Sequence, residues 1–220
     1  MLVLGLDTCG STGFVALGRL SGGTMQILSQ VEIEGRTCAA TLVSEIGGIL
    51  ARHDVPLSEV GCLVVVHGPG SFTGVRVGLS TAKGLSEGAD IPVIAVSRLE
   101  VMTWKAGTSN AALDAHRHEV FLRIEGRELL AGAAELEGLS APLKCVVCDP
   151  TSSAILAAAW PVSELQLVSD PCAADALSLA VPLINAREFS DIALLDGHYF
   201  RRSDAEIFGD PARAGSLPRT

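Results

Sequence analysis

A buried strand, a glycine-rich loop and a helix follow one another in residues 61–85, GCLVVVHGPGSFTGVRVGLSTAKGL. The run from Gly61 to Val66 is apolar and rich in valine, which predicts a buried strand. Gly68-Pro69-Gly70 ends that strand. Apolar and small residues then recur at helical spacing from Thr73 to Glu87, so we expect a helix there. A strand joined to a helix by a short loop is a building unit of α/β proteins.

Strands and helices alternate along the rest of the first hundred residues. The first two expected strands enclose the turn-rich segment Asp7–Gly13, which is typical of a hairpin. Ser97 is a suitable N-cap for a short helix that ends at Trp104. The alternation predicts the α/β class. The expected elements are strands at 2–6, 14–17, 26–33 and 91–96 and helices at 37–53 and 97–104.

The opening pattern of the chain returns about a hundred residues later. An aspartate, Asp7 or Asp114, ends an apolar run, and a phenylalanine, Phe14 or Phe121, follows seven positions on after a polar turn. This repeat predicts two lobes that begin alike. We expect one lobe at 1–104 and a smaller one at 105–220, whose tail packs back on the first. The further elements expected in the second lobe are strands at 146–147 and 165–168 and helices at 153–160 and 175–184.

Composition narrows the possible functions. The chain has 16 Lys and Arg against 25 Asp and Glu, a formal charge of −9, and 4% aromatic residues. Nucleic-acid binding needs clustered cations or stacking aromatics, so we expect no strong direct contact with nucleic acid. The apolar runs are strand-sized and the N-terminus has no basic leader, which argues against a membrane or exported protein. Six scattered cysteines are typical of reduced thiols in the cytoplasm.

Two sites are conceivable in the glycine-rich segment. The evidence for a phosphate-binding loop is weak. Thr73 stands where the GxGxxG pattern requires its last glycine, and the GxxxxGK[ST] pattern has no match. The helix carries Gly74, Gly78 and Ala82 at intervals of four, a ridge with almost no side chain. Glycine costs about 1 kcal/mol in a helix interior, so close packing of another helix is expected. That helix belongs either to this chain or to a partner.

Several stretches resemble landmarks of the TsaB (YeaZ) family. The segment from Gly68 to Leu85 resembles the family pattern GPGSFTGLRIG followed by a helix. Leu4–Thr8 and Ala112–Val120 resemble two further landmarks, and His198–Glu206 is similar to the last strand and tail of the family. The resemblance is strongest in the first hundred residues.

This resemblance implies the two-lobed fold of actin, heat-shock chaperones and sugar kinases, with mixed sheets flanked by helices. It implies a non-catalytic, cytoplasmic subunit in the formation of threonylcarbamoyladenosine in tRNA. The implied partners are a TsaD-like catalytic subunit and a TsaE-like ATPase, with a homodimer when the chain is alone. ATP and magnesium are then used by the complex, and this chain binds no cofactor alone. The partner surface is expected on the helices at 37–53 and 73–87, at Leu42, Ile46, Gly74, Val75, Arg76, Gly78, Leu79, Ala82 and Lys83.

Metal and nucleophile sites of the chain's own find little support. No histidine is followed by another four positions on, so the HxxxH metal site of the catalytic paralogue is missing. His116 and His118 lack an obvious third ligand, and Cys145 and Cys148 lack a second pair for zinc. Cys9 has no histidine tied to it, so nucleophilic catalysis is not expected. We expect no catalytic and no metal-binding residues, and the metallopeptidase alternative is the least favoured.

An ATP site is incomplete in sequence. Asp7, Thr8, Gly10 and Ser11 in the first hairpin are candidates for contact with phosphate or nucleotide. The matching turn, residues 114–119, has no glycine, and Asp7 alternatively caps its own turn. An actin-fold ATPase or small-molecule kinase therefore stays the alternative function.

Overall fold

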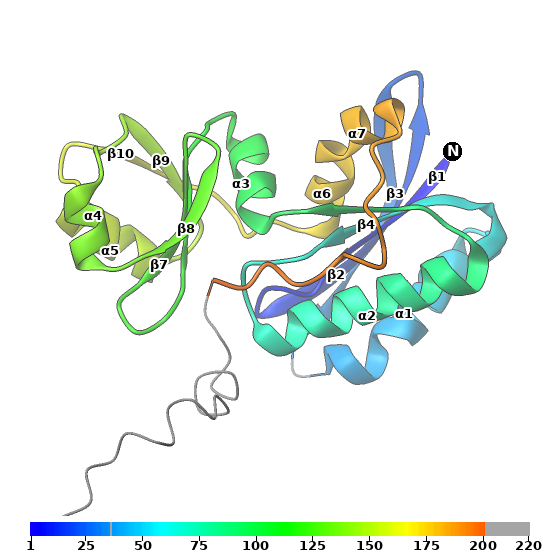
Figure 1. Ribbon diagram of the computed structural model, residues 1–220. Helices are drawn as coiled ribbons and strands as arrows, with labels where there is room; N and C mark the ends of the chain where they lie inside the picture. The colour runs from blue at the N-terminus through cyan, green and yellow to red at the C-terminus, as the bar shows by residue number, and fades with distance from the viewer. Residues whose placement is uncertain (36, 201–220) are drawn as a thin grey trace, which may run out of the picture.

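Two five-stranded mixed sheets form the two lobes of the protein (Figure 1). The computed structural model describes residues 1–35 and 37–200. The first sheet has the order β3-β2-β1-β4-β5 and the second β8-β7-β6-β9-β10. The first contains β1 (Leu2–Asp7), β2 (Thr12–Ser21), β3 (Thr24–Glu34), β4 (Val60–Val66) and β5 (Val93–Val96). The second contains β6 (Ala111–Asp114), β7 (Val120–Ile124), β8 (Arg127–Ala131), β9 (Lys144–Val147) and β10 (Glu164–Leu167).

The two sheets have the same topology, which confirms the two-lobed fold expected from the repeat. In each, an antiparallel three-stranded meander is followed by two parallel strands. Asp7 ends β1 opposite Phe14, whereas Asp114 ends β6 opposite Val120. The second turn is therefore one residue shorter than the first, and Phe121 pairs with Leu113 instead.

Helices cover both faces of each sheet. In the first lobe, α1 (Cys38–Arg52) and α2 (Phe72–Ala89) lie side by side on one face, and α6 (Ala173–Leu179) and α7 (Val181–Ala186) lie on the other (Figure 1). A short 3-10 turn, η1, covers Leu57–Glu59. In the second lobe, α4 (Ala133–Gly138) and α5 (Pro150–Ala159) cover one face and α3 (Arg98–Ala106) the other.

The starts of the helices follow the capping residues. Ser71 accepts a hydrogen bond from the Gly74 N–H at the start of α2, Ser97 caps α3, and Asp149 caps α5 before its first-turn proline. The helix expected at 175–184 is two helices, because Pro182 lies in the first turn of α7 rather than inside one helix. β8 and α4 were not expected from sequence, since both are short and weakly patterned.

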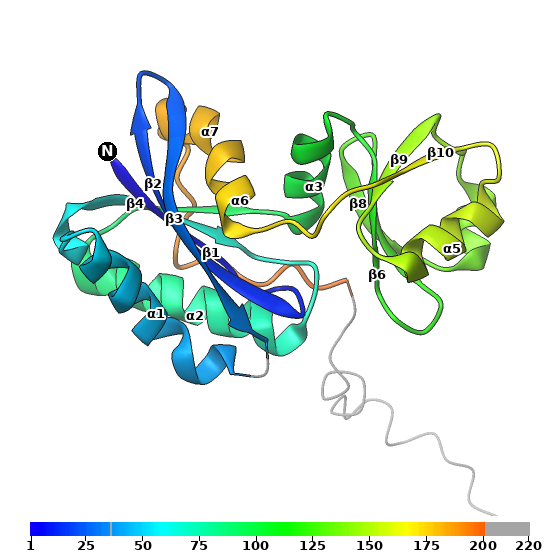
Figure 2. The ribbon, with the colours of Figure 1, turned by 180° about the vertical axis from the view of Figure 1, so that it is seen from behind.

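Two segments pack on the lobe opposite to the one assigned from sequence. Leu99 and Met102 of α3 join a buried cluster with Leu113 and Val146 of the second sheet. Helices α6 and α7, which follow the second lobe, bury their apolar side chains in the first core. Helices α3 and α6 lie next to each other between the sheets (Figure 2). Their side chains Lys105 and Asp175 form an ion pair of 2.8 Å. Helix α3 thus contacts both lobes, because Val101 lies in the first core, and the packing does not follow the boundary predicted at residue 104.

The chain then runs back along the first lobe as far as Phe200. Ser190 N–H donates to the Val93 carbonyl and its hydroxyl accepts from Ala95 N–H, which places this segment beside β5. His198 N–H donates to the His67 carbonyl, and the two imidazoles stack with centroids 5.3 Å apart. Residues 201–206 of the expected family tail lie outside the described part of the chain. Within that part, no helix is long and apolar enough to cross a membrane.

Candidate functional site

A cleft of about 870 Å³ opens between the lobes. Both strand-ending turns border it: the β1–β2 turn with Gly10 and Ser11, and the β6–β7 turn with Asp114 and His116. The loop before α2, the first residue of α3, and the segment 198–200 also line it. The structure thus brings the candidate residues Thr8, Gly10 and Ser11 together at one side of the cleft, with Asp7 buried beneath them.

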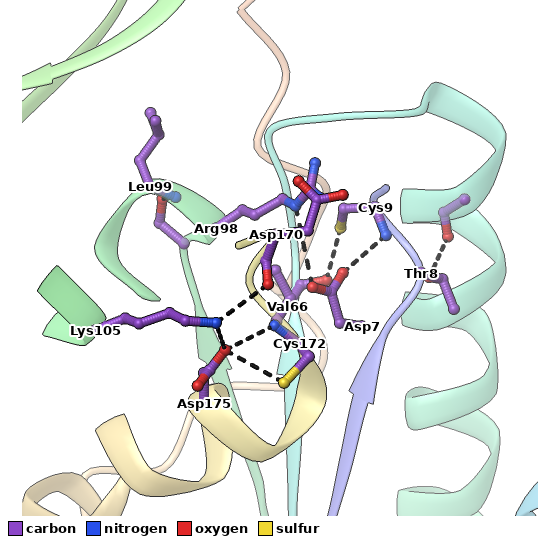
Figure 3. Close-up of polar contacts among 12 residues, drawn as sticks. Asp7, Thr8, Cys9, Val66, Arg98, Leu99, Lys105, Asp170, Cys172 and Asp175 are labelled. Atoms are coloured by element: carbon purple, nitrogen blue, oxygen red, sulfur yellow. Dashed lines mark hydrogen bonds and ion pairs between the residues drawn. The ribbon is translucent and has the colours of Figure 1, made fainter. Parts of the chain in front are cut away.

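The buried carboxylate of Asp7 already interacts with other groups of the protein. Its side chain is 1% exposed, and Oδ1 accepts a hydrogen bond of 2.9 Å from the Cys9 N–H. Oδ2 lies 4.0 Å from Nε of Arg98 (Figure 3). Burial raises the pKa of Asp7, and Arg98 and the Cys9 N–H only partly offset this effect. The sequence interpretation of Asp7 as a turn-capping carboxylate therefore matches its bond to Cys9.

Arg98 is the residue that sequence reasoning missed. It is the first residue of α3, yet its guanidinium reaches back to the β1–β2 turn, where Nη2 would lie 2.6 Å from a Cβ on residue 10. A side chain at position 10 would therefore displace the guanidinium from the turn. The sequence did contain a signal for Arg98. A cation in the first turn of a helix interacts unfavourably with the helix dipole, so an arginine at this position indicates a role outside the helix.

The Thr8 side chain also forms a contact within the fold. Its hydroxyl donates a hydrogen bond of 2.6 Å to the Gly74 carbonyl in the first turn of α2. A fixed guanidinium beside Asp7 repels a divalent cation, and the Thr8 hydroxyl is already used in packing. The residues present therefore do not fit a magnesium–nucleotide bound through Asp7.

The second turn has an unusual backbone. His116, Arg117 and His118 all have positive φ, at 60°, 56° and 63°. Asp114 holds this turn, since it accepts a hydrogen bond of 2.8 Å from the His116 N–H and lies 3.2 Å from its Nδ1. The described residues contain no group of three or more His, Cys, Asp or Glu side chains arranged to hold a metal ion.

The cysteines near the cleft are poor nucleophiles. The Cys9 thiol is buried and donates to the Val66 carbonyl at 3.2 Å. Burial, followed by the charge of Asp7, raises its pKa well above the usual value. Burial also raises the pKa of Cys148 to about 12. A thiolate is the reactive form, so neither thiol is activated.

Most residues of the expected partner surface face the interior of their own lobe. A Cβ on Gly74 or Gly78 would collide with Thr8, so the glycine ridge packs against the β1–β2 turn rather than against any helix. This corrects both packing alternatives drawn from the sequence. The side chains of Leu42, Ile46, Val75, Leu79 and Ala82 are buried in the first core, which leaves them unavailable at the surface.

Other residues than those predicted form most of the outer face of α1 and α2. Val43 is 66% exposed and Phe72 is 41% exposed. Arg76 is exposed and stacks on the Phe72 ring, with Cζ 3.8 Å from the centroid. Gly47 on α1 and Gly84 on α2 are exposed, and a Cβ on either would meet nothing within 4 Å. Lys83 lies at the edge of this face and is half-buried.

Comparisons with known proteins place the chain among its relatives. Residues 26–138, just over half of the chain, match the family described as TsaD, tRNA N6-adenosine threonylcarbamoyltransferase. The tRNA threonylcarbamoyladenosine biosynthesis protein TsaB of Haemophilus influenzae is 38% identical over 134 residues, 58% of this chain and 55% of that protein. The Escherichia coli protein of the same name is 35% identical over 127 residues, 55% of this chain and 53% of that protein. The chain thus aligns with about half the length of these curated relatives.

Solved structures extend the likeness to both lobes. YeaZ from Pseudomonas aeruginosa has a TM-score of 0.69 at 26% identity, covering 90% of this chain and 99% of that one. A second Pseudomonas aeruginosa structure, of a protein described as similar to peptidase YEAZ, has a TM-score of 0.75 at 26% identity, covering 91% of this chain and 99% of the other. With a family model that matches just over half of its residues, the chain belongs to the TsaD-like family, and it is similar to the TsaB (YeaZ) proteins over both lobes.

Proposed function

We propose that this chain acts in the formation of threonylcarbamoyladenosine in tRNA, as a non-catalytic subunit that binds and supports a TsaD-like catalytic subunit. The names of its TsaB relatives support the pathway. The observation that carries the scaffold role is the outer face of α1 and α2, with an exposed valine, an exposed phenylalanine and two helix glycines in open space. Exposed apolar side chains next to bare backbone favour the docking of another helix.

The exposed positions share a face on each helix. On α1, Ala40, Val43 and Gly47 lie three to four residues apart, and all are exposed. On α2, Arg76, Ser80 and Gly84 are exposed at intervals of four. Such spacing aligns side chains in one stripe along a helix. A partner helix laid against these stripes contacts Val43, Gly47 and Gly84, while the buried residues beneath hold the stripes in place.

The same face supports a homodimer when the chain is alone, because a two-fold pair presents one patch to itself. A TsaE-like ATPase completes the proposed assembly. In this proposal ATP and magnesium are used by the complex, and the chain resides in the cytoplasm without strong direct nucleic-acid binding.

The test is co-purification with a TsaD-like subunit and reconstituted tRNA modification. We expect Val43→Glu and Gly84→Leu each to lose both, because they place a charge or bulk on the stripe. Val162→Glu is the matched control, since Val162 is 87% exposed in the second lobe. Gly78 is unsuitable as a test position, because a side chain there disturbs the first core. Retained co-purification and full modification with both variants would refute the interface.

An ATPase or small-molecule kinase remains the alternative, favoured by the cleft between two actin-like lobes and opposed by the Asp7–Arg98 pair. Titration of the isolated chain with ATP and magnesium separates the two proposals. Micromolar binding with turnover favours the enzyme, and its absence together with TsaD binding favours the scaffold.

A further inference from the structure

We propose that the cleft between the lobes contains a metal-independent oxyanion site in which the Arg98 guanidinium is the fixed cation. Its ligand is a small molecule with a phosphate or carboxylate group at one end and hydroxyl or amino donors at the other. The inference concerns the isolated chain and does not depend on the scaffold role.

The first argument is the unmet hydrogen-bonding capacity of Arg98. The residue is 7% exposed, and its Nε has no hydrogen-bond partner. Among the described residues, none accepts a hydrogen bond from any guanidinium nitrogen of Arg98. A guanidinium has five N–H donors, and buried donors are nearly always paired. Asp7, at 4.0 Å, supplies charge but no hydrogen bond, so the planar donor set is left for an external acceptor.

The second argument is where those donors lie. Arg98 lines the cleft together with the β1–β2 turn and the first turn of α2. Because α2 is 18 residues long, the N–H groups of Phe72 and Thr73 at its start have no acceptor within the helix and carry the positive end of its dipole. Ser71 takes the next N–H, that of Gly74. A guanidinium and free helix-terminal amides in the same cleft supply hydrogen-bond donors for an oxyanion.

The third argument explains why no metal is needed. A divalent cation usually brings phosphate to a carboxylate, but here the carboxylate of Asp7 already faces a permanent cation. Arg98 cannot lose its proton at physiological pH, and its backbone is anchored by a 2.7 Å bond from its N–H to the Gly68 carbonyl. The positive charge is therefore covalently part of the site.

Carboxylates in the same cleft define the other end of the ligand. Three of them line it, Asp114, Asp149 and Asp170. Asp149 is saturated by Ser152 and by the Asp114 N–H, and Asp114 is engaged by its own turn. Asp170 adds a further negative charge near Cys148 and Arg98. A purely anionic molecule is repelled by these carboxylates, whereas a molecule that also carries hydroxyl or amino donors can pair with them.

The experiment titrates the full chain with orthophosphate, AMP or acetate in a buffer free of other oxyanions, by calorimetry and thermal shift. Each titration is run with a chelator and with magnesium. We expect orthophosphate or acetate, whichever class the site takes, to bind and raise Tm, and AMP to bind more tightly than orthophosphate if the class is phosphate. Magnesium is expected to change affinity less than twofold. Absence of binding by all three probes, or binding lost on chelation, would overturn the proposal.

Variants then locate the binding. Arg98→Lys keeps the charge beside Asp7 but removes the planar fork, so we expect at least a tenfold loss of affinity. Arg19→Lys, on an exposed part of β2 away from the cleft, is the matched control and should bind as the wild type. Should Arg98→Lys fold poorly, the Nε–Hε NMR signal of Arg98 in the wild type replaces it, and we expect phosphate or acetate to shift that signal. An unshifted signal, or unchanged affinity in Arg98→Lys, would contradict the site.

Discussion

The Thr8 hydroxyl donates a hydrogen bond of 2.6 Å to the Gly74 carbonyl, and this contact fixes the β1–β2 turn against the first turn of α2. The two backbones approach so closely that a Cβ on Gly74 would collide with the Thr8 carbonyl oxygen. The position therefore requires glycine for packing.

Gly74→Ala is expected to destabilise the chain, because a backbone carbonyl cannot yield as a flexible side chain does. Overpacking of this kind costs about 1–3 kcal/mol. Gly84→Ala is the matched control, as its Cβ enters open space, and it is expected to stabilise by about 0.5–1 kcal/mol. Urea unfolding of both variants measures the difference. A stabilised Gly74→Ala would mean that the turn and helix can separate without cost.

Arg98→Met is expected to destabilise the protein at pH 7 by about 3–5 kcal/mol, the usual cost of leaving one buried charge unpaired. The pKa of Asp7 is already raised by burial, and loss of Arg98 raises it further. A raised carboxyl pKa favours the folded state at low pH, and that contribution is lost as pH rises through the folded pKa. The deficit relative to wild type should therefore shrink from pH 7 to pH 5 in unfolding experiments. A deficit that does not change with pH would show that Asp7 stays ionised.

Glu128→Gln is expected to loosen the junction between the lobes. The Glu128 carboxylate is 6% exposed and accepts bonds of 2.7 Å from both Arg123 and Ser97, while His198 lies 3.3 Å away. Charge-assisted hydrogen bonds contribute about 1.5–3 kcal/mol each, so the free energy of unfolding should fall by an amount of that order.

The control for this change is Glu164→Gln, whose 3.6 Å pair with Lys144 is mostly exposed and should contribute nothing measurable. Equal stability of the two variants would refute the proposed role of Glu128.

Alkylation tests the state of Cys9. Burial and the neighbouring Asp7 raise the pKa of its thiol, so at pH 8 it is protonated and unreactive. We expect iodoacetamide to label Cys9 only after unfolding in urea, as followed by peptide mass spectrometry. Equal labelling rates in native and unfolded protein would show that the thiol is accessible and ionised.

Local patterns were sufficient to predict the α/β class and most element positions. The valine run of β4, the N-cap Ser97 and the glycine loop before α2 are all readable from neighbouring residues. The repeated strand–aspartate–turn was sufficient to predict two lobes. The sheet that α3 and α6 each pack against could not be predicted. The sequence of an amphipathic helix indicates its apolar face but not the sheet that this face contacts.

The site was harder to predict for the same reason. Asp7, Thr8, Gly10 and Ser11 are consecutive enough to be grouped from sequence, but Arg98 joins them only through the fold. The glycine ridge gave the correct inference of close packing, yet its contact is a strand turn and not a helix. Exposure of Val43 likewise depends on how α1 and α2 lie against the sheet.

The placement of α6 on the first sheet has a consequence for synthesis on the ribosome. Ala173, Ala176 and Leu177 cover the face of the first sheet opposite α1 and α2. Chains are synthesised from the N-terminus at about 5–20 residues per second, and domains usually fold as units during synthesis. In this protein, the face of the first sheet that α6 covers stays exposed until the whole second lobe has been translated. A newly made chain is therefore most exposed to aggregation and chaperone capture in that interval, which ends when α6 leaves the exit tunnel.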